Sequence, residues 1–300
     1  MRRRWAVLPA LMVLVVLLAF ASGCEHRSEA APAADAPAAT LTATAGYGAT
    51  ELLSTRVAPD QSVMRALRGA TEVDTAYAGG FVNGMLGHPS DHGGQSDWFF
   101  FVNGVAAPVG AKDVTLHDGD AVWWDYRAWP LLISTPAVVG AWPAPLVLPG
   151  GRGPAVAADA PLAAMLAADG GRLTAGSSSW RARVGASDAL ATRDPAWRRA
   201  LADPDAAGLA VTIAAGRIVA LGPDGRSREP VPGARALVAA VPSGTDATKG
   251  VLFVVAGLDA GSARAAADAI VAHPEILRQR YSLAFDGLGH PLRAGGRVGP

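Results

Sequence analysis

The sequence predicts an α+β protein with two domains, and three observations support this prediction. The chain has 300 residues, half of them hydrophobic, which is enough for two domains that each bury a core. Short strand-like segments joined by glycine-containing turns, with one helical segment, dominate residues 40–132. Residues 159–292 combine continuous apolar runs with several helical segments, which is typical of an α/β or α+β domain.

The N-terminus has the three parts of a secretory signal peptide. Three arginines at positions 2–4 precede an apolar run at 6–21, and small residues lead up to Cys24. The apolar run contains a proline and is about 16 residues long, which is shorter than the roughly 20 residues needed to span a membrane. An uncleaved membrane anchor is the alternative interpretation of this segment.

The sequence around the cysteine predicts a lipid anchor. Residues 21–24, Ala-Ser-Gly-Cys, resemble a lipobox, where bacterial signal peptidase cuts before a cysteine that carries lipid, although Ala21 stands where leucine is usual. Cys24 is the only cysteine, whereas exported proteins ordinarily use cysteines in disulfide pairs. We therefore expect a lipoprotein signal peptide at 1–23. The lipid on Cys24 would hold the chain on the extracytoplasmic face of the cell membrane.

Composition and charge exclude some partners. The net charge is zero, and removal of the signal peptide takes away three arginines and no acidic residue. Because the sequence has no basic patch or charged tail, we expect no nucleic-acid binding. Residues 24–39 are mostly small residues and prolines, which cannot bury enough apolar surface to offset their ordering entropy, so we expect a disordered tether.

The first domain, expected at 40–132, opens with two short strands at 41–44 and 51–57. A helix is expected from residue 63, capped by Asp60 or Ser62, because apolar residues then recur at helical spacing. The later strand segments are expected at 73–77, 81–85, 98–102 and 114–127, the last including a turn. The dipeptide Asn103-Gly104 after the aromatic segment is a strong hairpin signal.

Five blocks of this domain resemble the transcobalamin-like C-terminal domain family. They are Ser62–Leu67, Gly79–Val82, Trp98–Gly104, Gly110–Ala111 and Leu116–Arg127. The resemblance covers about residues 42–128 and implies a β-grasp-like fold. That family forms the smaller, lid-like domain of animal cobalamin carriers and occurs in bacterial surface proteins. It therefore implies cobalamin or a related corrinoid as ligand, although nothing in this chain resembles the helical-barrel domain that holds most of the cobalamin in those carriers.

Aromatic residues crowd the second half of this domain. Strand alternation sends Trp98 and Phe100 to one face of their strand, and Phe99 and Phe101 to the other. In the later strand, Trp123 and Asp125 are likewise expected to lie opposite Trp124 and Tyr126. In one interpretation all the aromatic residues belong to the core or to a domain interface. In the other, one set forms an apolar platform for a planar or macrocyclic ligand. The expected ligand-binding residues are Trp98, Phe100, Trp123, Trp124, Tyr126 and Trp129.

The loop at 87–97 contains two histidines, His88 and His92, that are candidate metal ligands. The loop is rich in glycine, no helix fixes the spacing of the two rings, and no His-Glu-x-x-His motif is present. A solvated loop of polar turn residues is the simpler interpretation. We therefore expect no metal site and no required cofactor, with a corrinoid as the candidate ligand.

The remaining chain divides into a proline-rich segment, a second domain and a tail. Residues 133–158 are expected to be a linker, or a strand that crosses between the domains, and 293–300 a flexible tail. The second domain, at 159–292, has strand signals at 179–185, 209–213, 217–221, 236–241, 251–257 and 281–285. Its helices are expected from Pro161, from a cap at Asp194, and from a cap at Asp259 or Ser262.

No catalytic motif is recognisable in the second domain. The segment at 244–250 lacks the Gly-Lys-Ser/Thr ending of a phosphate-binding loop and precedes a strand, and 176–179 is not a nucleophile elbow. We therefore expect no catalytic residues, although a hydrolase stays as a third hypothesis. The first hypothesis is a surface-anchored protein that captures a corrinoid or similar large ligand and delivers it to a membrane transporter. The alternative is a surface module that binds a protein or glycan.

Overall fold

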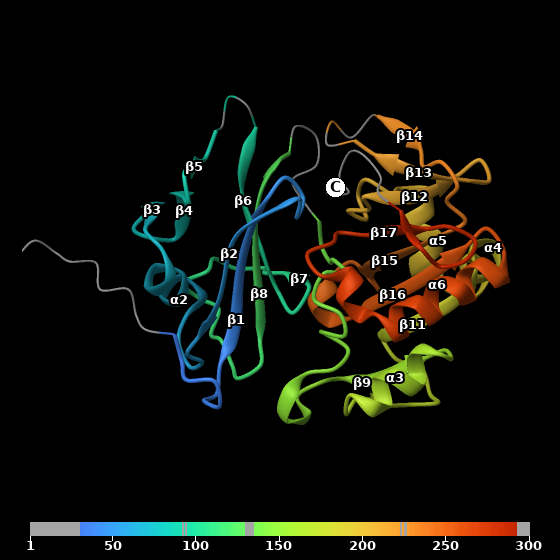
Figure 1. The fold of residues 1–300 in the computed structure, drawn as a ribbon, viewed down its shortest axis with the longest axis horizontal. Coiled ribbons are helices and arrows are strands. Elements are labelled where there is room, and N and C mark those ends of the chain that lie inside the picture. Colours follow the sequence, from blue (N-terminus) through green and yellow to red (C-terminus); the bar gives the residue numbers. More distant parts are fainter. Residues whose placement is uncertain are drawn as a thin grey trace, which may run out of the picture.

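The computed structural model describes residues 31–91, 93, 95–129, 135–222, 224 and 227–292. The expected signal peptide, Cys24, His92 and the expected C-terminal tail lie outside these residues. The protein is α+β, with a mixed sheet in an N-terminal region and a second mixed sheet in a C-terminal region (Figure 1). No helix within the described ranges combines the length and the apolar character needed to cross a membrane.

The N-terminal region is built on a five-stranded sheet in the order β2-β1-β8-β6-β7. Its strands are β1 (Ala39–Ala45), β2 (Thr50–Val57), β6 (Ser96–Val102), β7 (Val105–Ala106) and β8 (Ala121–Ala128). The first strand, β1, runs parallel to the last, β8, and the other pairings are antiparallel. A parallel pair of first and last strands at the centre of the sheet, with a helix on one face, is the expected β-grasp-like arrangement.

The helix on this sheet is α2 (Val63–Ala70), and its position follows from its sequence. The Ser62 hydroxyl accepts a hydrogen bond from the backbone N–H of Arg65, which caps the first turn as predicted. The apolar side chains from Val63 to Leu67 are buried against the sheet. A small sheet of β3 (Val73–Ala76), β4 (Phe81–Met85) and β5 (His88–Pro89) lies beside the helix (Figure 1).

The C-terminal region contains a seven-stranded sheet in the order β10-β9-β11-β16-β15-β17-β18. Its strands are β9 (Ala155–Ala158), β10 (Arg172–Leu173), β11 (Trp180–Ala186), β15 (Ala236–Pro242), β16 (Val251–Gly257), β17 (Leu283–Phe285) and β18 (Pro291–Leu292). A separate sheet contains β12 (Val211–Ala214), β13 (Arg217–Leu221) and β14 (Arg228–Pro230). Short 3-10 helices lie at Pro149–Gly151, Ala247–Lys249 and Pro274–Leu277.

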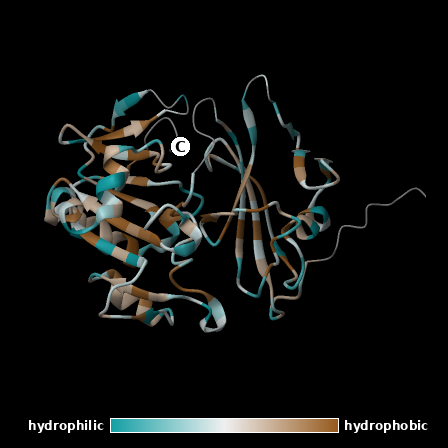
Figure 2. Cartoon of the chain, turned by 180° about the vertical axis from the view of Figure 1, so that it is seen from behind, coloured by the Kyte–Doolittle hydropathy of each residue, from teal (hydrophilic) through white to brown (hydrophobic). Residues whose placement is uncertain are grey.

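Helices cover both faces of the seven-stranded sheet, and its strands β15 and β16 are apolar and almost entirely buried (Figure 2). One face packs against α3 (Leu162–Ala168) and α6 (Ala260–Ala272). The other packs against α4 (Ser187–Arg193) and α5 (Pro195–Ala202). The predicted caps of α5 and α6 are present, because the carboxylates of Asp194 and Asp259 accept backbone N–H groups of their helices.

The proline-rich segment after the first sheet is packed into the protein. The side chains of Ala137, Val139, Trp142 and Leu146 are buried in the core of the C-terminal region, where the Trp142 ring centroid lies 3.9 Å from that of Phe253. The segment then enters β9, which begins within the range expected to be a linker. This stretch is therefore part of the second core rather than an extended spacer.

Two predicted hairpins owe their turns to residues with positive φ. Asn103 and Gly104 have φ values of 53° and 76° and join β6 to β7. Ala215 and Gly216, at 49° and 70°, join β12 to β13. Both hairpins are confirmed, and each has the two-residue loop that suits the twist of antiparallel strands. The structure adds α4, β5, β9, β10, β14 and β18, which the sequence did not predict.

Candidate functional site

The aromatic side chains of β6 and β8 divide between the two faces of the sheet. Trp98 and Trp124 belong to the core on the α2 side, and the partly buried Phe100 and Tyr126 pack against that core. Phe101 and Trp123 instead join a cluster that faces the C-terminal region. The division follows the alternation predicted from the sequence, because neighbouring residues of a strand point to opposite faces.

The aromatic residues on the α2 side form two packed pairs. The rings of Phe100 and Trp124 are stacked, with centroids 4.6 Å apart and an interplanar angle of 22°. Those of Trp98 and Tyr126 lie 5.3 Å apart, and the indole N–H of Trp98 donates to the backbone carbonyl of His88 at 2.9 Å. Trp98 and Trp124 are only 5 % and 3 % exposed, so both stabilise the domain as well as bordering its surface.

Trp123 lies between the two regions of the protein. Its ring centroid is 5.4 Å from that of Phe101 and 5.1 Å from that of Tyr281, which comes from the C-terminal region. Its indole N–H donates to the hydroxyl of Thr44 at 2.8 Å. Both its apolar surface and its polar group are therefore engaged by the protein itself.

Asp125, the next residue, is buried in the same contact between regions. Its carboxylate accepts hydrogen bonds from the Thr44 hydroxyl at 2.6 Å, the Gly48 N–H at 3.1 Å and the Tyr281 hydroxyl at 2.8 Å. Burial raises the pKa of Asp125 to about 6, although the three hydrogen bonds and the nearby Arg127 oppose the rise. Burial also raises the pKa of Tyr281, so the phenol stays a donor.

A groove of about 440 Å³ opens beside β6, and its walls are mostly apolar. It is bordered by residues on both faces of β6, so it must pass around the outer edge of that strand. The apolar walls come from α2, β4, β6, β8 and the residue after β8, and include Met64, Phe81, Trp98, Phe99, Phe100, Phe101, Trp124 and Trp129. Asp97, Arg127 and Thr135 supply polar groups. A concave apolar surface with a few polar groups is the usual form of a small-molecule site.

Among the described residues, the outer edge of β6 is unpaired where it borders the groove. Asp91 bridges Ser96 at one end of the strand and β7 pairs with its other end, but none of the described residues pairs with the edge between them. Because Ser96 exchanges both backbone hydrogen bonds with Asp91, every second residue after it turns its backbone to the same edge. The carbonyls of Trp98 and Phe100 and the N–H of Phe100 therefore face the groove, whereas the N–H of Trp98 bonds to the Asp97 carboxylate.

Two tryptophans in the groove wall bury a hydrogen-bond donor for which the described part of the chain offers no acceptor. The indole N–H groups of Trp124 and Trp129 are both buried, and no described residue accepts a hydrogen bond from either. A buried unsatisfied donor costs about 1–3 kcal/mol. Arg127 lies in the same wall, with its guanidinium carbon 3.8 Å from the ring centroid of Phe99. The wall of the groove thus contains buried donors as well as aromatic surface.

The groove contains four of the six predicted ligand-binding residues. Trp98, Phe100, Trp124 and Trp129 line it, Tyr126 lies outside the lining on the same face of the sheet, and Trp123 packs between the two regions. The lining also includes residues that were not among the predicted ligand-binding residues, namely Met64, Phe81, Asp97, Phe99, Phe101 and Arg127. Alternation along β6 and β8 could have indicated Asp97, Phe99 and Arg127. No local pattern could have indicated Phe81 and Met64, because these residues come from distant segments of the chain.

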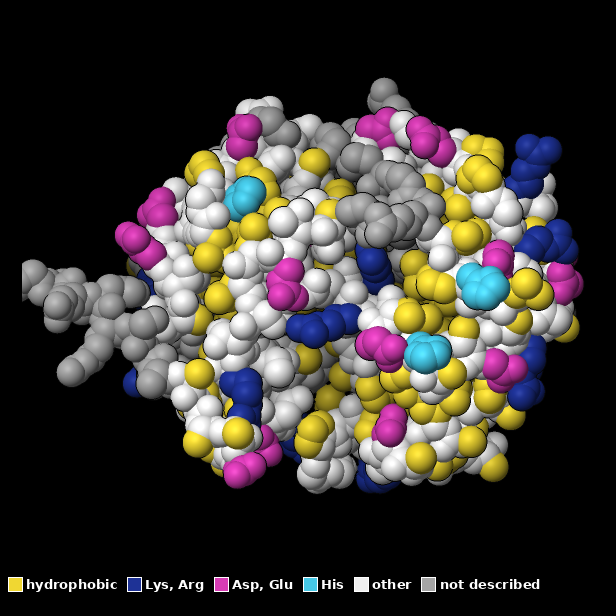
Figure 3. All heavy atoms as spheres, in the orientation of Figure 1, with side chains coloured by type: hydrophobic (Ala, Val, Ile, Leu, Met, Phe, Trp, Pro, Cys, Tyr) yellow, Lys and Arg dark blue, Asp and Glu magenta, His cyan; other side chains and the backbone are white. Residues whose placement is uncertain are grey.

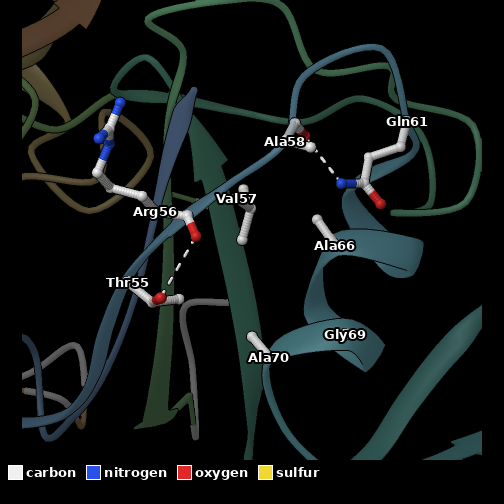
Figure 4. A pocket seen from close by; sticks show the side chains of 8 residues that line it. All are labelled: Thr55, Arg56, Val57, Ala58, Gln61, Ala66, Gly69 and Ala70. Carbon is white, nitrogen blue, oxygen red and sulfur yellow. Dashed lines mark hydrogen bonds between the residues drawn. The ribbon is translucent and has the colours of Figure 1, made fainter. Parts of the chain in front are cut away.

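A smaller cavity between β2 and α2 is too small for a comparable ligand. It holds about 40 Å³ and is bordered by the end of β2 and by Gln61, Ala66 and Ala70 (Figure 4). The Gln61 side-chain N–H donates to the carbonyl of Ala58 at 2.8 Å, while its carbonyl oxygen is buried without a described partner. The volume is enough for a few water molecules.

His88 is packed against aromatic rings rather than into the groove. Its ring centroid lies 4.9 Å from that of Tyr126, and His88 does not line the groove. Within the described ranges, no three or more His, Cys, Asp or Glu side chains come together in an arrangement that could hold a metal ion. On the face seen in Figure 3, acidic and basic side chains are interspersed and form no patch of one sign.

Comparison with known proteins places a family domain on this site. Residues 60–128, which contain α2, β6 and β8, match the family described as "Domain of unknown function (DUF4430)". A crystal structure from Ruminococcus gnavus, described as a "putative metal binding protein", is similar to 31 % of this chain and 98 % of its own, with 18 % identity and a TM-score of 0.27. No curated protein matches the sequence.

Proposed function

We propose that the protein is a binding protein that captures a large, mostly apolar ligand in the groove beside β6. The observation that carries this proposal is the groove itself, in which aromatic walls, an open strand edge and a cation occur together. Its volume of about 440 Å³ lies within the range of roughly 300–1,000 Å³ that is usual for small-molecule sites. The ligand would stack on Phe100 and Trp129 and accept hydrogen bonds from Phe100 N–H and Arg127.

A corrinoid is the ligand class that we propose to test first. The transcobalamin-like resemblance of residues 42–128 overlaps the DUF4430 match and supports this choice. A complete cobalamin is larger than the groove, so the groove would hold one edge of the macrocycle while the rest stays exposed. The amide side chains at the rim of a corrin are acceptors that suit Arg127 and the open N–H of Phe100.

The proposed cellular role follows from the predicted lipid anchor. A diacylated or triacylated Cys24 would hold the protein on the extracytoplasmic face of the membrane, because two or more acyl chains anchor stably. A ligand captured there would be passed to a membrane transporter. Binding rather than catalysis is the proposed activity.

We expect cobalamin or cobinamide to bind to the chain from residue 31 with micromolar or tighter affinity. Trp129→Ala should weaken binding about tenfold or more, because it removes aromatic stacking at the groove wall. Trp180→Ala, which removes a partly buried tryptophan of the other region, is the matched control and should bind as the wild type does. Calorimetric titration and the corrin absorption spectrum provide the two measurements.

Absence of heat and of any spectral change at high protein concentration would remove the corrinoid proposal. Equal weakening by both variants would instead show that the groove is not the site. In either case a titration of the unmodified chain with other macrocyclic ligands would test the groove independently of corrin chemistry.

A surface interaction module is the second candidate function, and the open edge of β6 favours it. An extended segment of a partner could pair with the backbone of Trp98 and Phe100, as strands added to sheet edges do. Tyr77, near the groove residue Phe81, is 86 % exposed and could extend the contact with a protein or glycan. Protection of the Phe100 amide from hydrogen exchange on adding a partner, without affinity for corrinoids, would favour this function.

A further inference from the structure

The C-terminal region contains a second concave site, and its chemistry differs from that of the β6 groove. A pocket of about 630 Å³ lies between β11 and the α4–α5 junction. Four arginines line it, namely Arg181, Arg183, Arg193 and Arg199. Ser178 and Ser243 add polar groups at one end. The β6 groove is lined by residues of the N-terminal region and Thr135, so the two sites are separate.

The fold explains why these arginines converge. Arg181 and Arg183 are two residues apart on β11 and therefore point to the same face of the sheet. Their register partners, Leu252 and Val254, belong to the face that α4 and α5 cover. Arg193 ends α4, and the next helix presents its first turns to the same space.

Positive charge exceeds negative charge in this pocket. Asp194 forms a bidentate pair with Arg181, with N–O distances of 2.8 and 3.0 Å. Asp159 accepts from Arg183 at 2.9 Å and also from Arg193, so one carboxylate serves two guanidinium groups. Four arginines thus face two carboxylates, which leaves a surplus of two positive charges.

Three of the arginines keep donors available for a ligand. Arg183 and Arg193 each bond to described residues through one terminal nitrogen. Arg199 does so only to the backbone carbonyl of Ser243, at 2.8 Å, and no carboxylate among the described residues pairs with it. A guanidinium group has five N–H donors in a planar fork that matches phosphate oxygens, so the described residues leave most of the donors in this pocket unused.

We propose that this pocket binds a phosphate-bearing anion. A phosphate monoester carries a charge of about −1.5 to −2 at neutral pH, which matches the surplus on the pocket. Bidentate guanidinium–phosphate contacts are strong, charge-assisted hydrogen bonds, and Arg183, Arg193 and Arg199 can form them without breaking their pairs with the protein. The volume exceeds that of a phosphate ion, so the pocket has room for the group that the phosphate is attached to.

The test is a titration with inorganic phosphate and pyrophosphate at constant ionic strength, with chloride as the reference salt. Wild-type protein should bind pyrophosphate more tightly than chloride, seen as calorimetric heat and as a rise in Tm. Arg199→Gln and Arg193→Gln should each weaken pyrophosphate binding about tenfold, because each removes a charge-assisted contact. Both side chains are on exposed residues, so both variants should fold.

Arg198→Gln is the matched control. Arg198 is exposed on the same helix, makes a comparable bond to the Ala191 carbonyl at 3.1 Å, and does not line the pocket. Arg198→Gln removes the same charge as Arg199→Gln, so a general electrostatic effect would weaken pyrophosphate binding equally in these two variants. Equal affinity in the Arg198 and Arg199 variants, or no binding of pyrophosphate beyond that of chloride, would overturn the proposal.

Vesicles distinguish the two sources of the phosphate group. Binding to phosphatidylglycerol vesicles but not to phosphatidylcholine vesicles, lost in Arg199→Gln and kept in Arg198→Gln, would identify a lipid headgroup. Binding of pyrophosphate with the same variant pattern and no binding to vesicles would identify a soluble phosphorylated ligand. The result is independent of the corrinoid titration, because neither Trp129 nor the β6 groove takes part.

Discussion

Trp197→Ala is expected to lower the free energy of unfolding by about 3–5 kcal/mol. Trp197 is completely buried and is among the largest fully buried side chains of the described residues. It comes from α5 and packs with the β15 and β16 side chains of the second core, and its indole N–H donates to the hydroxyl of Ser187 at 3.1 Å. Removing the ring leaves a cavity that a close-packed core fills only partly. Urea unfolding followed by circular dichroism measures the change.

Trp197→Phe separates the packing of the ring from its hydrogen bond. It keeps much of the apolar volume and leaves the Ser187 hydroxyl without its donor, so it should cost clearly less than the alanine variant. A decrease in unfolding free energy below about 1 kcal/mol in Trp197→Ala would contradict the packing of α5 on this sheet, since removing a buried tryptophan from a filled core destabilises a protein by more than this.

The stability of the protein is expected to rise as the pH falls from 8 to 5. The pKa of Asp125 is about 6 in the folded protein and lies near 3.8 without burial. A group with a raised folded pKa stabilises the fold when protonated, and this contribution is lost as the pH rises through the folded value. The gain between pH 8 and pH 5 should be about 1.4 kcal/mol, and most of it should appear below pH 6.5. Urea unfolding at each pH measures it.

Asp125→Asn is the control for this dependence. An asparagine keeps the shape of the side chain and can still accept from Thr44 and Gly48, but it does not titrate. The difference in unfolding free energy between wild type and variant isolates Asp125 from the other carboxylates. Those with lowered pKa, such as Asp120, lose their contribution only at more acidic pH. If the difference in unfolding free energy between the wild type and Asp125→Asn stays constant from pH 8 to 5, Asp125 is not buried in this contact.

Local patterns in the sequence were sufficient for most elements of the fold. Alternation along β6 and β8 predicted which aromatic residues share a face, and Asn103-Gly104 predicted the hairpin that follows β6. Ser62, Asp194 and Asp259 cap helices as expected. These features depend on residues within a few positions of one another, so the chain carries their signals without reference to its tertiary structure.

The candidate sites, in contrast, depend on contacts between distant segments. Six aromatic residues were expected to bind ligand together, but Tyr281 and Phe101 enclose Trp123 because the C-terminal region packs against that face of the sheet. The proline-rich segment could be a linker or a crossing strand, and the apolar core beside it accounts for its burial. Among the described residues, the edge of β6 stays open because β7 has only two residues and pairs with only the end of that strand.

Sequence alone accounts for which residues are aromatic, which caps and turns form, and which face each strand residue takes, because these are local consequences of backbone geometry. Tertiary structure alone decided that Trp129 and Phe81 share a groove and that Arg183 and Arg199 share a pocket. The physical reason is that a face of a strand is equally able to meet a helix, another domain or solvent. Which of these covers it depends on how the whole chain buries its apolar surface.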